Sequence, residues 1–307
     1  MKSKIILFMF ILLLAFSQSI LAQKGQPAPP VDSIIYNDGK VDYATSSAKF
    51  SIASKDTISE VKSILFKVDK GDFIEYQKPL SIPEEGPHTI YYYSIDNVGN
   101  QSTTIAYPVV IDNTPPDVSL SPDFKLYSAN NKLYAPLAAK FSIVASDALS
   151  GVKSIEYTLG ASKYQPYKTP ITIGKAGDET IKFKATDFVG NTAVEKTLSF
   201  FVDNVKPMVK IIPSGSFYQK NNRNYAPKSF QYTIEASDTE SGIARILVSL
   251  DGGEFVVYES PISFETEGDH TIVAKAIDNV GNTSDEIRQA VTVDISPPNV
   301  ELKPEVK

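Results

Sequence analysis

The sequence predicts an all-β chain of three tandem β-sandwich modules, arranged as an extended array after an N-terminal signal peptide. Two observations carry the sandwich prediction. A pattern of aromatic, acidic and glycine residues recurs at a fixed interval, and every repeat holds short runs of alternating apolar and polar residues. A third observation, the apolar N-terminal segment, is typical of an exported protein.

The first 22 residues have the order of a secretory signal peptide. Lys2 and Lys4 precede an unbroken apolar run from Ile5 to Phe16, and Ser-Gln-Ser-Ile-Leu-Ala follows, with Ala22 the predicted last residue removed. This run is shorter than the roughly 20 residues that a membrane-spanning helix needs, so a retained anchor is the less favoured alternative. Residues 23–30 then form a predicted flexible leader.

The repeat is marked by the motif Asp-x-x-Gly-Asn, whose Asp recurs every 91 residues at Asp96, Asp187 and Asp278. The same shift superimposes tyrosines, glycines and prolines along the chain, and a proline follows each closing Asp. Such a register indicates homologous modules of about 90 residues. We expect them at residues 31–113, 114–204 and 205–296. A tail at 297–307 follows, and its first residues resemble the first strand of a further module.

The middle module shows how each unit is expected to fold. Five of its segments have the period of two that is typical of half-buried strands, and we find no helical period outside the signal segment. The segments are 139–146, 153–159, 170–173, 179–187 and 194–203. Six or seven short strands in about 90 residues are typical of an immunoglobulin-like (Ig-like) β-sandwich. Without cysteine, such a module depends on packed Ile, Val, Phe and Tyr side chains.

The Asp-x-x-Gly-Asn motif lies between two predicted strands of each module. An Asp carboxylate can accept hydrogen bonds from backbone N–H groups two residues further on, and glycine adopts positive φ without strain. The motif is therefore predicted to close the turn of the last hairpin. His88 and His270 stand at equivalent positions after another turn, and we expect both to be solvated loop residues.

A sharper hypothesis assigns a metal to the repeated acidic residues. Each module has one Asp before its Ser-Gly-Val-like segment, one in the turn motif and one at its closing boundary. Loops gather at the ends of a sandwich, so some of these carboxylates are expected near the next module, where they could bind Ca²⁺. The candidates are Asp56, Asp96, Asp112, Asp147, Asp187, Asp203, Asp238, Asp278 and Asp294. The alternative is that each Asp forms only a turn.

Composition excludes several functions. The formal net charge of −6 gives no field for nucleic acid, and the absence of cysteine excludes disulfides and thiolate metal sites. With two histidines and no recognisable nucleophile or phosphate-loop motif, the chain is predicted not to be an enzyme and to need no cofactor apart from the candidate Ca²⁺.

At this point the order of motifs resembles a known family. The third module has Asp238, Ser241-Gly242-Ile243, Asp251-Gly252-Gly253 and Asp278 to Asn282, and is similar to bacterial Ig-like surface modules of the OmpL-type outer-membrane repeat. The second module departs at Gly160-Ala161-Ser162, and the first has Glu60 where the third has Gly242. The resemblance implies exposure at the cell surface or outer membrane and binding to host matrix proteins.

Taken together, these features predict an exported, non-enzymatic protein of the cell surface, outer membrane or periplasm. It would present protein-binding surfaces, as an adhesin does, or act as a spacer. Its expected partner is an extracellular-matrix or cell-envelope protein, and any membrane association is not through a helix. One alternative is an integral outer-membrane β-barrel, because alternating strands suit both structures. A second is a carbohydrate-binding protein using the tyrosines near Tyr91 and Tyr93.

Overall fold

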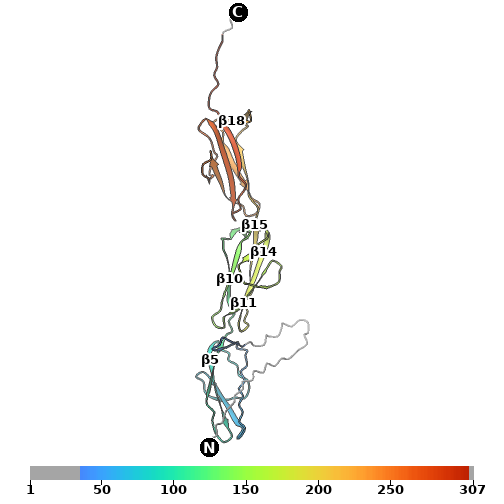
Figure 1. Cartoon of the computed structure of the whole chain (residues 1–307), viewed down its shortest axis with the longest axis vertical. Helices are drawn as coiled ribbons and strands as arrows, with labels where there is room; N and C mark the ends of the chain where they lie inside the picture. Colours follow the sequence, from blue (N-terminus) through green and yellow to red (C-terminus); the bar gives the residue numbers. More distant parts are fainter. Residues whose placement is uncertain (1–34, 304–307) are drawn as a thin grey trace. The chain divides into compact units, whose positions relative to one another are not determined.

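The computed structural model describes residues 35–303, so the predicted signal peptide and leader lie outside the described residues. Every regular element in that range is a β-strand (Figure 1). Within these residues there is no helix that is long and apolar enough to cross a membrane. The all-β fold class and its Ig-like open sandwiches are therefore confirmed.

Three six-stranded sheets repeat one strand order. The first contains, in spatial order, β1 (Tyr36–Asn37), β2 (Asp42–Ala44), β6 (Ile105–Ile111), β5 (Gly86–Asp96), β3 (Val61–Val68) and β4 (Ile74–Glu75). The second contains β8 (Tyr127–Ala129), β9 (Lys132–Pro136), β15 (Lys196–Asp203), β14 (Gly177–Asp187), β11 (Val152–Leu159) and β12 (Gln165–Pro166). The third contains β17 (Tyr218–Lys220), β18 (Arg223–Ala226), β23 (Ile287–Val293), β22 (Gly268–Asp278), β20 (Ile243–Leu250) and β21 (Val256–Val257).

One parallel pairing recurs in all three sheets, between the last long strand and the second strand of the opening hairpin.

Two smaller sheets face the second and the third six-stranded sheet. One contains β13 (Ile171–Thr172), β10 (Lys140–Ser146) and β7 (Asp117–Pro122), and the other contains β16 (Met208–Pro213) and β19 (Tyr232–Ser237). In the first repeat, the residues equivalent to β10 form only an isolated bridge between Phe50 and Leu80 among the described residues.

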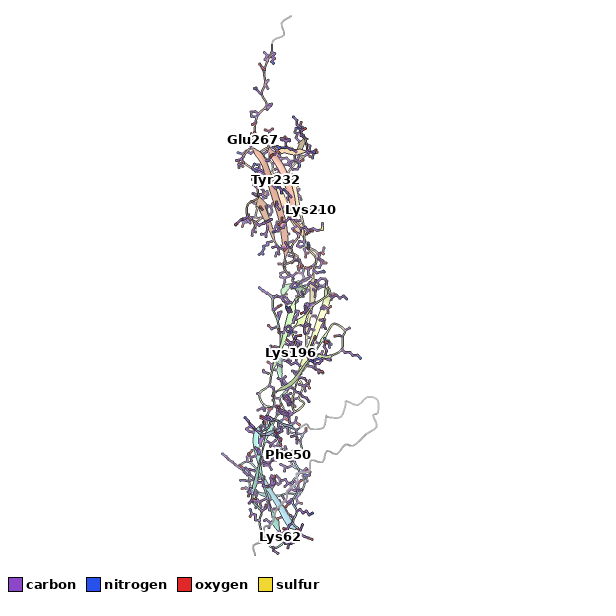
Figure 2. All side chains as sticks on the ribbon, viewed as in Figure 1. Phe50, Lys62, Lys196, Lys210, Tyr232 and Glu267 are labelled. Atoms are coloured by element: carbon purple, nitrogen blue, oxygen red, sulfur yellow. The ribbon has the colours of Figure 1, made fainter. Side chains whose placement is uncertain are left out.

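Alternation along the long strands builds the cores, as predicted. In β14, Ile181, Phe183 and Ala185 are buried, while in β10 Phe141 and Ile143 are buried. The third repeat has a continuous core around Tyr232 (labelled in Figure 2), which is fully buried and packs against the rings of Phe217, Phe230 and Phe264. Apolar burial of this kind stabilises a sandwich that has no disulfide.

Contacts divide the chain into two compact units. The first comprises residues up to Ser121, Ile143–Thr169 and Ile181–Thr197, and the second comprises Pro122–Ser142, Pro170–Thr180 and residues from Leu198 onward. The segments that lead from one repeat into the next are the first connector, residues 112–122, and the second connector, residues 203–213. The acidic residues near each connector belong to a single unit.

The predicted motif turn is confirmed in all three repeats. The backbone N–H of the residue two positions on donates to the Asp Oδ1 at 3.0 Å in every case. The glycine of the motif has φ of 92°, 98° and 102° at Gly99, Gly190 and Gly281. These angles lie in the left-handed region that glycine adopts without strain. The Asp therefore fixes the turn that follows each eleven-residue strand β5, β14 and β22.

Candidate metal centres at the connectors

Six of the nine predicted aspartates come together in two clusters of the same composition. The first cluster is Asp112, Asp147 and Asp187, and the second cluster is Asp203, Asp238 and Asp278. In each, one carboxylate oxygen per residue lies within 4.8 Å of the others. Each cluster therefore joins the closing Asp of one repeat to the loop Asp and the motif Asp of the following repeat.

Local hydrogen bonds hold each carboxylate in place. Asp147 Oδ1 accepts the backbone N–H groups of Leu149 and Gly151 at 3.1 and 2.7 Å, which leaves its Oδ2 without a hydrogen bond to the described residues. Asp112 Oδ2 accepts the backbone N–H of Ser150 at 3.0 Å. In the second cluster, Asp203 Oδ2 accepts the N–H of Ser241 at 3.1 Å. The two clusters are thus built by the same rules.

The motif asparagines tie the connectors to the turns. Asn191 Nδ2 donates to Asp187 Oδ2 at 2.7 Å and to the backbone carbonyl oxygen of Asp112 at 3.0 Å. Asn282 makes the same two contacts with Asp278 and Asp203, at 2.7 and 3.2 Å. The sequence gives the Asn a place in the turn motif, but not this second contact, which needs the connector beside it.

Negative charge accumulates at the clusters without a neighbouring cation. No Lys, Arg or His among residues 35–303 forms an ion pair with any of the six carboxylates. Two carboxylates 4.8 Å apart repel by about 3.5 kcal/mol at an effective dielectric constant near 20. Water reduces this figure for Asp147 and Asp238, which are half-buried, but the other four side chains are almost fully buried.

The first repeat provides a comparison at the same position. Burial, together with the charge of Asp112, raises the pKa of Asp187 in spite of the hydrogen bonds that it accepts. For Asp96, burial also acts to raise the pKa, but hydrogen bonds from Ser59 and Asn100 outweigh it and the pKa is lowered. The pKa values of the two motif aspartates are therefore shifted in opposite directions, mainly because Asp187 is the more deeply buried of the two.

A buried serine beside each cluster has an unpaired hydroxyl group. Ser150 and Ser241 are 5% and 4% exposed, and neither Oγ has a hydrogen-bond partner among the described residues. Each donates its backbone N–H to the connector carboxylate. The equivalent hydroxyl in the first repeat, Ser59 Oγ, donates to Asp96 Oδ2 at 2.8 Å. A buried hydroxyl without a partner is unfavourable, and an ion in the cluster would give it one.

These donors fit a hard cation. All are oxygens, which suits Ca²⁺ or Mg²⁺ better than Zn²⁺. Ca²⁺ bonds to oxygen at about 2.3–2.6 Å, so ligands on opposite sides of the ion are about 4.6–5.2 Å apart, which accommodates the 4.8 Å limit of the clusters. The three carboxylates would supply the charge, and the serine hydroxyl and water would complete the coordination.

The other three predicted aspartates lie apart from such a cluster. Asp56 Oδ1 accepts the N–H groups of Ile58, Ser59 and Glu60, and Asp96 forms its own turn nearby. No described connector carboxylate joins this pair. Asp294 is exposed and accepts the N–H of Ser296 at 3.0 Å. For these three residues, the described structure shows turn formation alone.

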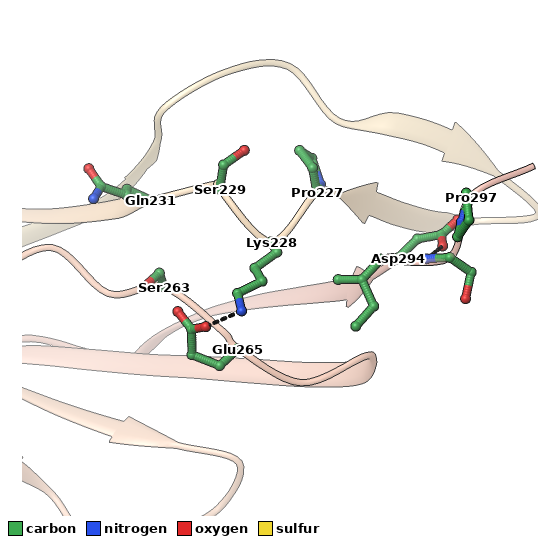
Figure 3. Close-up of a pocket in the computed structure, with 10 residues that line it drawn as sticks. Pro227, Lys228, Ser229, Gln231, Ser263, Glu265, Asp294 and Pro297 are labelled. Atoms are coloured by element: carbon green, nitrogen blue, oxygen red, sulfur yellow. Dashed lines mark hydrogen bonds and ion pairs between the residues drawn. The ribbon is translucent and has the colours of Figure 1, made fainter.

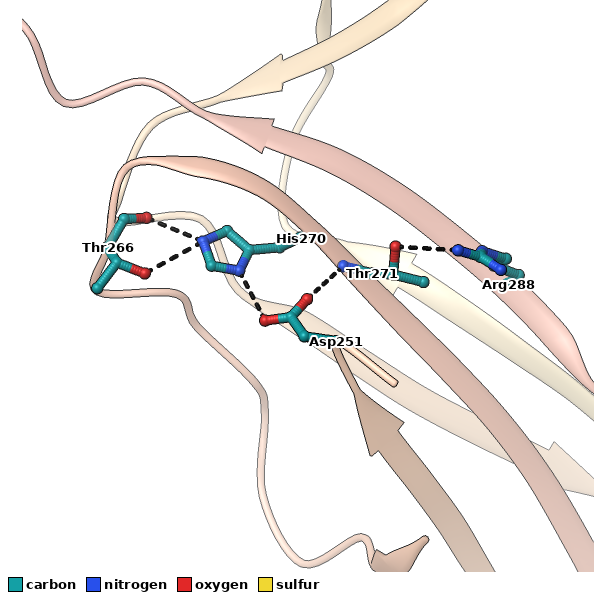
Figure 4. A network of polar contacts seen from close by, with 5 residues as sticks. All are labelled: Asp251, Thr266, His270, Thr271 and Arg288. Carbon is teal, nitrogen blue, oxygen red and sulfur yellow. Dashed lines mark hydrogen bonds and ion pairs between the residues drawn. The ribbon is translucent and has the colours of Figure 1, made fainter. Parts of the chain in front are cut away.

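The expectation that the two histidines are solvated loop residues is wrong. The side chains of His88 and His270 are only 9% and 11% exposed. His270 Nδ1 lies 2.9 Å from Asp251 Oδ2, and its Nε2 lies 3.0 Å from the carbonyl oxygen of Thr266 (Figure 4). Burial acts to lower the pKa of His270, but the Asp251 carboxylate and the Thr266 carbonyl outweigh it and raise the pKa.

His88 has the same surroundings, with Asp69 Oδ2 at 2.7 Å and the carbonyl oxygen of Glu84 at 3.0 Å. Both rings use both nitrogens to fasten one loop to the start of the long strand that follows. The sequence signal was present, because Asp69 and Asp251 are spaced identically from the two histidines. This pairing occupies both histidines structurally, leaving neither nitrogen free to act as a base.

An open hollow of about 710 Å³ lies at the closing end of the third repeat. Its walls include Pro227, Ser263 and Asp294, and an ion pair between Lys228 and Glu265 lies along it (Figure 3). The lining mixes polar side chains with the apolar Pro227, Ile295 and Pro297, and the tail leaves the repeat beside it. The hollow lacks the enclosing apolar walls of a small-molecule site.

The tyrosine pair considered for sugar binding does not form a flat platform. Tyr92 is buried beside Ile90 as predicted, which places Tyr91 and Tyr93 on the other face of the sheet. Tyr93 meets Phe73 edge to face, with ring centroids 4.9 Å apart and an angle of 65° between the rings. Lys67 lies over Phe73 and Tyr91, which further occupies this face.

No family model matches this sequence, and no curated protein matches it. Among solved structures, the chain is similar to fibronectin(III)-like modules of CbhA from Clostridium thermocellum, with 16% identity and a TM-score of 0.35 over 61% of this chain and 100% of that chain. It is also similar to a bacterial ice-binding adhesin, with 12% identity and a TM-score of 0.33 over 81% and 90% of the two chains.

A third similar structure is the Bacteroides ovatus protein SGBP-B in complex with a mixed-linkage heptasaccharide. The identity is 15% and the TM-score 0.19, over 82% of this chain and 65% of that chain. Because these identities and TM-scores are low, no residue role is transferred from the three proteins to this chain.

Proposed function

We propose that this chain is an exported, non-enzymatic repeat protein that presents protein-binding surfaces, or acts as a spacer, at the cell surface or in the periplasm. The observation that carries the proposal is the pair of equivalent acidic clusters. Each fastens a connector to the repeat that follows, and Ca²⁺ bound there would hold neighbouring repeats in a fixed orientation. A repeated orienting device suits a protein that spans distance or displays surfaces, whereas catalysis needs a single assembled site.

Three further observations support this reading. The N-terminal segment has the order of a secretory signal, and the motif order resembles OmpL-type surface repeats. Both histidines are used in structural hydrogen bonds. The proposed partner is an extracellular-matrix or cell-envelope protein, because sandwich modules of this kind leave extensive strand edges and loops for protein contacts.

The proposal predicts that protease added to intact cells cleaves the protein, and that urea or high salt releases it from the envelope without detergent. A cytosolic protein measured in the same samples controls for lysis. Protection from protease in intact cells, and in cells whose outer layer alone has been opened, would contradict export and with it the proposed role.

A further inference from the structure

The Asp–His pairs of the first and third repeats belong to a larger set that the second repeat lacks. Each set has an Asp in the turn after the first long strand, a His near the start of the next long strand, and a Glu three residues before that His. The members are Asp69, His88 and Glu85 in the first repeat, and Asp251, His270 and Glu267 in the third. The 91-residue register places Gly160, Glu179 and Ala176 at these positions in the second repeat. All three members are replaced together, which indicates that they act together, and we refer to each set as a latch.

Each histidine ring faces two atoms that accept hydrogen bonds and cannot donate them. His88 Nδ1 lies 2.7 Å from Asp69 Oδ2, and its Nε2 lies 3.0 Å from the carbonyl oxygen of Glu84. His270 has the same two kinds of contact (Figure 4). A neutral imidazole carries one N–H and donates to only one of two such acceptors, whereas an imidazolium carries two N–H groups and donates to both. The geometry therefore fits the protonated ring.

The surroundings of His270 favour the proton. Asp251 contacts the ring, Asp269 adds a weaker negative field, and β23 presents the uncharged Val291 beside it. The ring of Phe264 lies stacked on the imidazole, with centroids 4.2 Å apart. Burial acts to lower the pKa of His270, but the Asp251 carboxylate and the backbone carbonyl at Nε2 outweigh it and raise the pKa.

His88 has a matching environment. Asp69 contacts its ring, and β6 presents the uncharged Val109 beside it. Burial acts to raise the pKa of Asp69, but hydrogen bonds from His88 and from the Thr89 N–H outweigh it and lower the pKa. No Lys or Arg among residues 35–303 forms an ion pair with Asp69 or Asp251. Within the described part of the chain, the histidine is therefore the cation that neutralises each of these carboxylates.

Each latch holds the segment from which its Glu grips the chain that leaves the repeat. Glu85 Oε1 accepts the N–H groups of Asn113 and Thr114 at 3.0 and 3.1 Å, and its Oε2 accepts Thr114 Oγ1 at 3.0 Å. These contacts lower the pKa of Glu85, so it stays ionised where histidine titrates. Glu267 makes one equivalent contact in the third repeat. The histidine holds the carbonyl of the residue directly before each Glu, so the ring fixes the backbone that carries the grip.

We propose that each latch is a proton-dependent fastener, which maintains the grip of Glu85 or Glu267 while the ring is imidazolium and releases it when the ring loses a proton. In the neutral ring, Nδ1–H stays with the Asp carboxylate, and the bare Nε2 repels the carbonyl oxygen that it faces. The first latch should release more completely than the third. Thr266 Oγ1 lies 3.3 Å from His270 Nε2 and can donate to the neutral ring, whereas Glu84 has no hydroxyl group.

The pH dependence has a definite sign. The pKa of His270 in the folded chain lies above its ordinary value of 6.5. The stability that this latch contributes is complete below that ordinary value and is lost as the pH rises through the raised pKa. The first latch is built in the same way, so residues 113–114 of the first connector should be held more firmly in mildly acidic than in alkaline solution.

Hydrogen exchange at the backbone amides of Asn113 and Thr114 tests the first latch, because Glu85 accepts a hydrogen bond from both. Residues 23–307 are compared at about pH 6 and about pH 9 in the same calcium concentration, on either side of the range in which histidine titrates. Each rate is divided by the rate expected for the unfolded chain. We expect the protection of both amides to fall by about tenfold at the higher pH, the factor that one pKa unit represents.

Asp69→Asn separates the role of the proton from a purely structural role. The new side-chain oxygen still accepts the Thr89 N–H, and the new NH₂ group donates to a neutral Nδ1. His88 can then hold Glu84 through Nε2–H without a second proton. The protection of the two amides should therefore be the same at both pH values. Asp72→Asn removes an equal charge from an exposed position in the same loop and should behave as the unchanged chain does.

Nitrogen NMR of the imidazoles is an independent readout, since it distinguishes a ring with two N–H groups from a ring with one. Comparison with His270→Gln assigns the two rings, and the loss of the second proton from His88 should coincide with the loss of amide protection. Equal protection at both pH values in the unchanged chain, a fall that persists in Asp69→Asn, or a neutral His88 ring at about pH 6 would overturn the proposal. None of these results depends on the acidic clusters, so failure here leaves the proposed function standing.

Discussion

Calcium is expected to raise the melting temperature of residues 23–307 by several degrees. An ion that binds only the folded state at 100 times its dissociation constant stabilises that state by about 2.7 kcal/mol per site. Calcium should stabilise the folded state more at a cluster than at an isolated carboxylate, because the ion cancels the repulsion among the three carboxylates of the cluster. Differential scanning calorimetry, with and without chelator, measures the effect and separates repeats that melt independently.

The variants Asp147→Asn and Asp238→Asn should change the melting temperature in opposite directions in calcium and in chelator. Asparagine keeps the Oδ1 that accepts the two turn N–H groups, and it removes one negative charge from the cluster. We expect each variant to melt below the unchanged chain in calcium and above it in chelator. Asp56→Asn makes the same change where no connector carboxylate is present, and it should shift neither melt at low protein concentration. Variants that respond to calcium as the unchanged chain does would contradict the assignment.

The pH dependence of the calcium-free chain has a definite sign. The pKa of Asp187 in the folded chain lies above its ordinary value of 3.8, so ionisation of this group opposes folding. The penalty is absent below that ordinary value and is fully present once the pH exceeds the raised pKa. In chelator, stability contributed by this site should therefore fall as pH rises through that window, and calcium should remove the fall.

Asp278→Ala is expected to destabilise the third repeat by about 3–5 kcal/mol. The carboxylate is 2% exposed and accepts the backbone N–H groups of Val280, Gly281 and Asn282, at 2.7 to 3.0 Å. It also accepts Asn282 Nδ2 at 2.7 Å. Alanine leaves these donors without an acceptor in a partly buried turn, and a buried unpaired donor costs about 1–3 kcal/mol. Urea unfolding followed by tyrosine fluorescence measures the loss.

Asp96→Ala in the first repeat is the matched control. It removes the contacts with Val98, Asn100 and Ser59 Oγ, and no connector carbonyl accepts a hydrogen bond from Asn100 in the described structure. The difference between the two variants therefore reports the combined effect of the second connector, of its acidic cluster and of the contacts from Ser59 and Gly281 that the two turns do not share. A loss below about 1 kcal/mol for Asp278→Ala would show that water replaces the carboxylate, and that the motif does not hold the turn.

Local patterns predicted most of the strands and the turns. Alternation over residues 179–187 identifies β14 and places Ile181 and Phe183 in the core, because the period of two is a property of the strand itself. The Asp-x-x-Gly-Asn turn follows equally from short-range chemistry. The short strands β8, β9 and β12 are harder to predict, since two to five residues carry little periodicity and β9 and β12 each contain a Pro.

The grouping of the aspartates depends on long-range strand pairing, which the sequence alone does not reveal. From their positions in the sequence, the three aspartates of one repeat would be expected to cluster together. In the structure, Asp112 instead clusters with Asp147 and Asp187 of the next repeat. This grouping depends on the strand order, which returns residues 35 and 75 positions away to the connector. The prediction for the histidines failed for a related reason, because the Asp69–His88 contact joins the turn after β3 to β5, and the equal Asp–His spacing in two repeats is a signal that a local rule does not use.

The central claim is that each connector cluster is a calcium site, and a calorimetric titration of residues 23–307 with calcium tests it most directly. We predict that two ions bind per chain at low protein concentration. Asp147→Asn or Asp238→Asn should leave one ion, the double variant none, and Asp56→Asn two. The absence of binding to the unchanged chain, or an equal stoichiometry in all four variants, would contradict the claim.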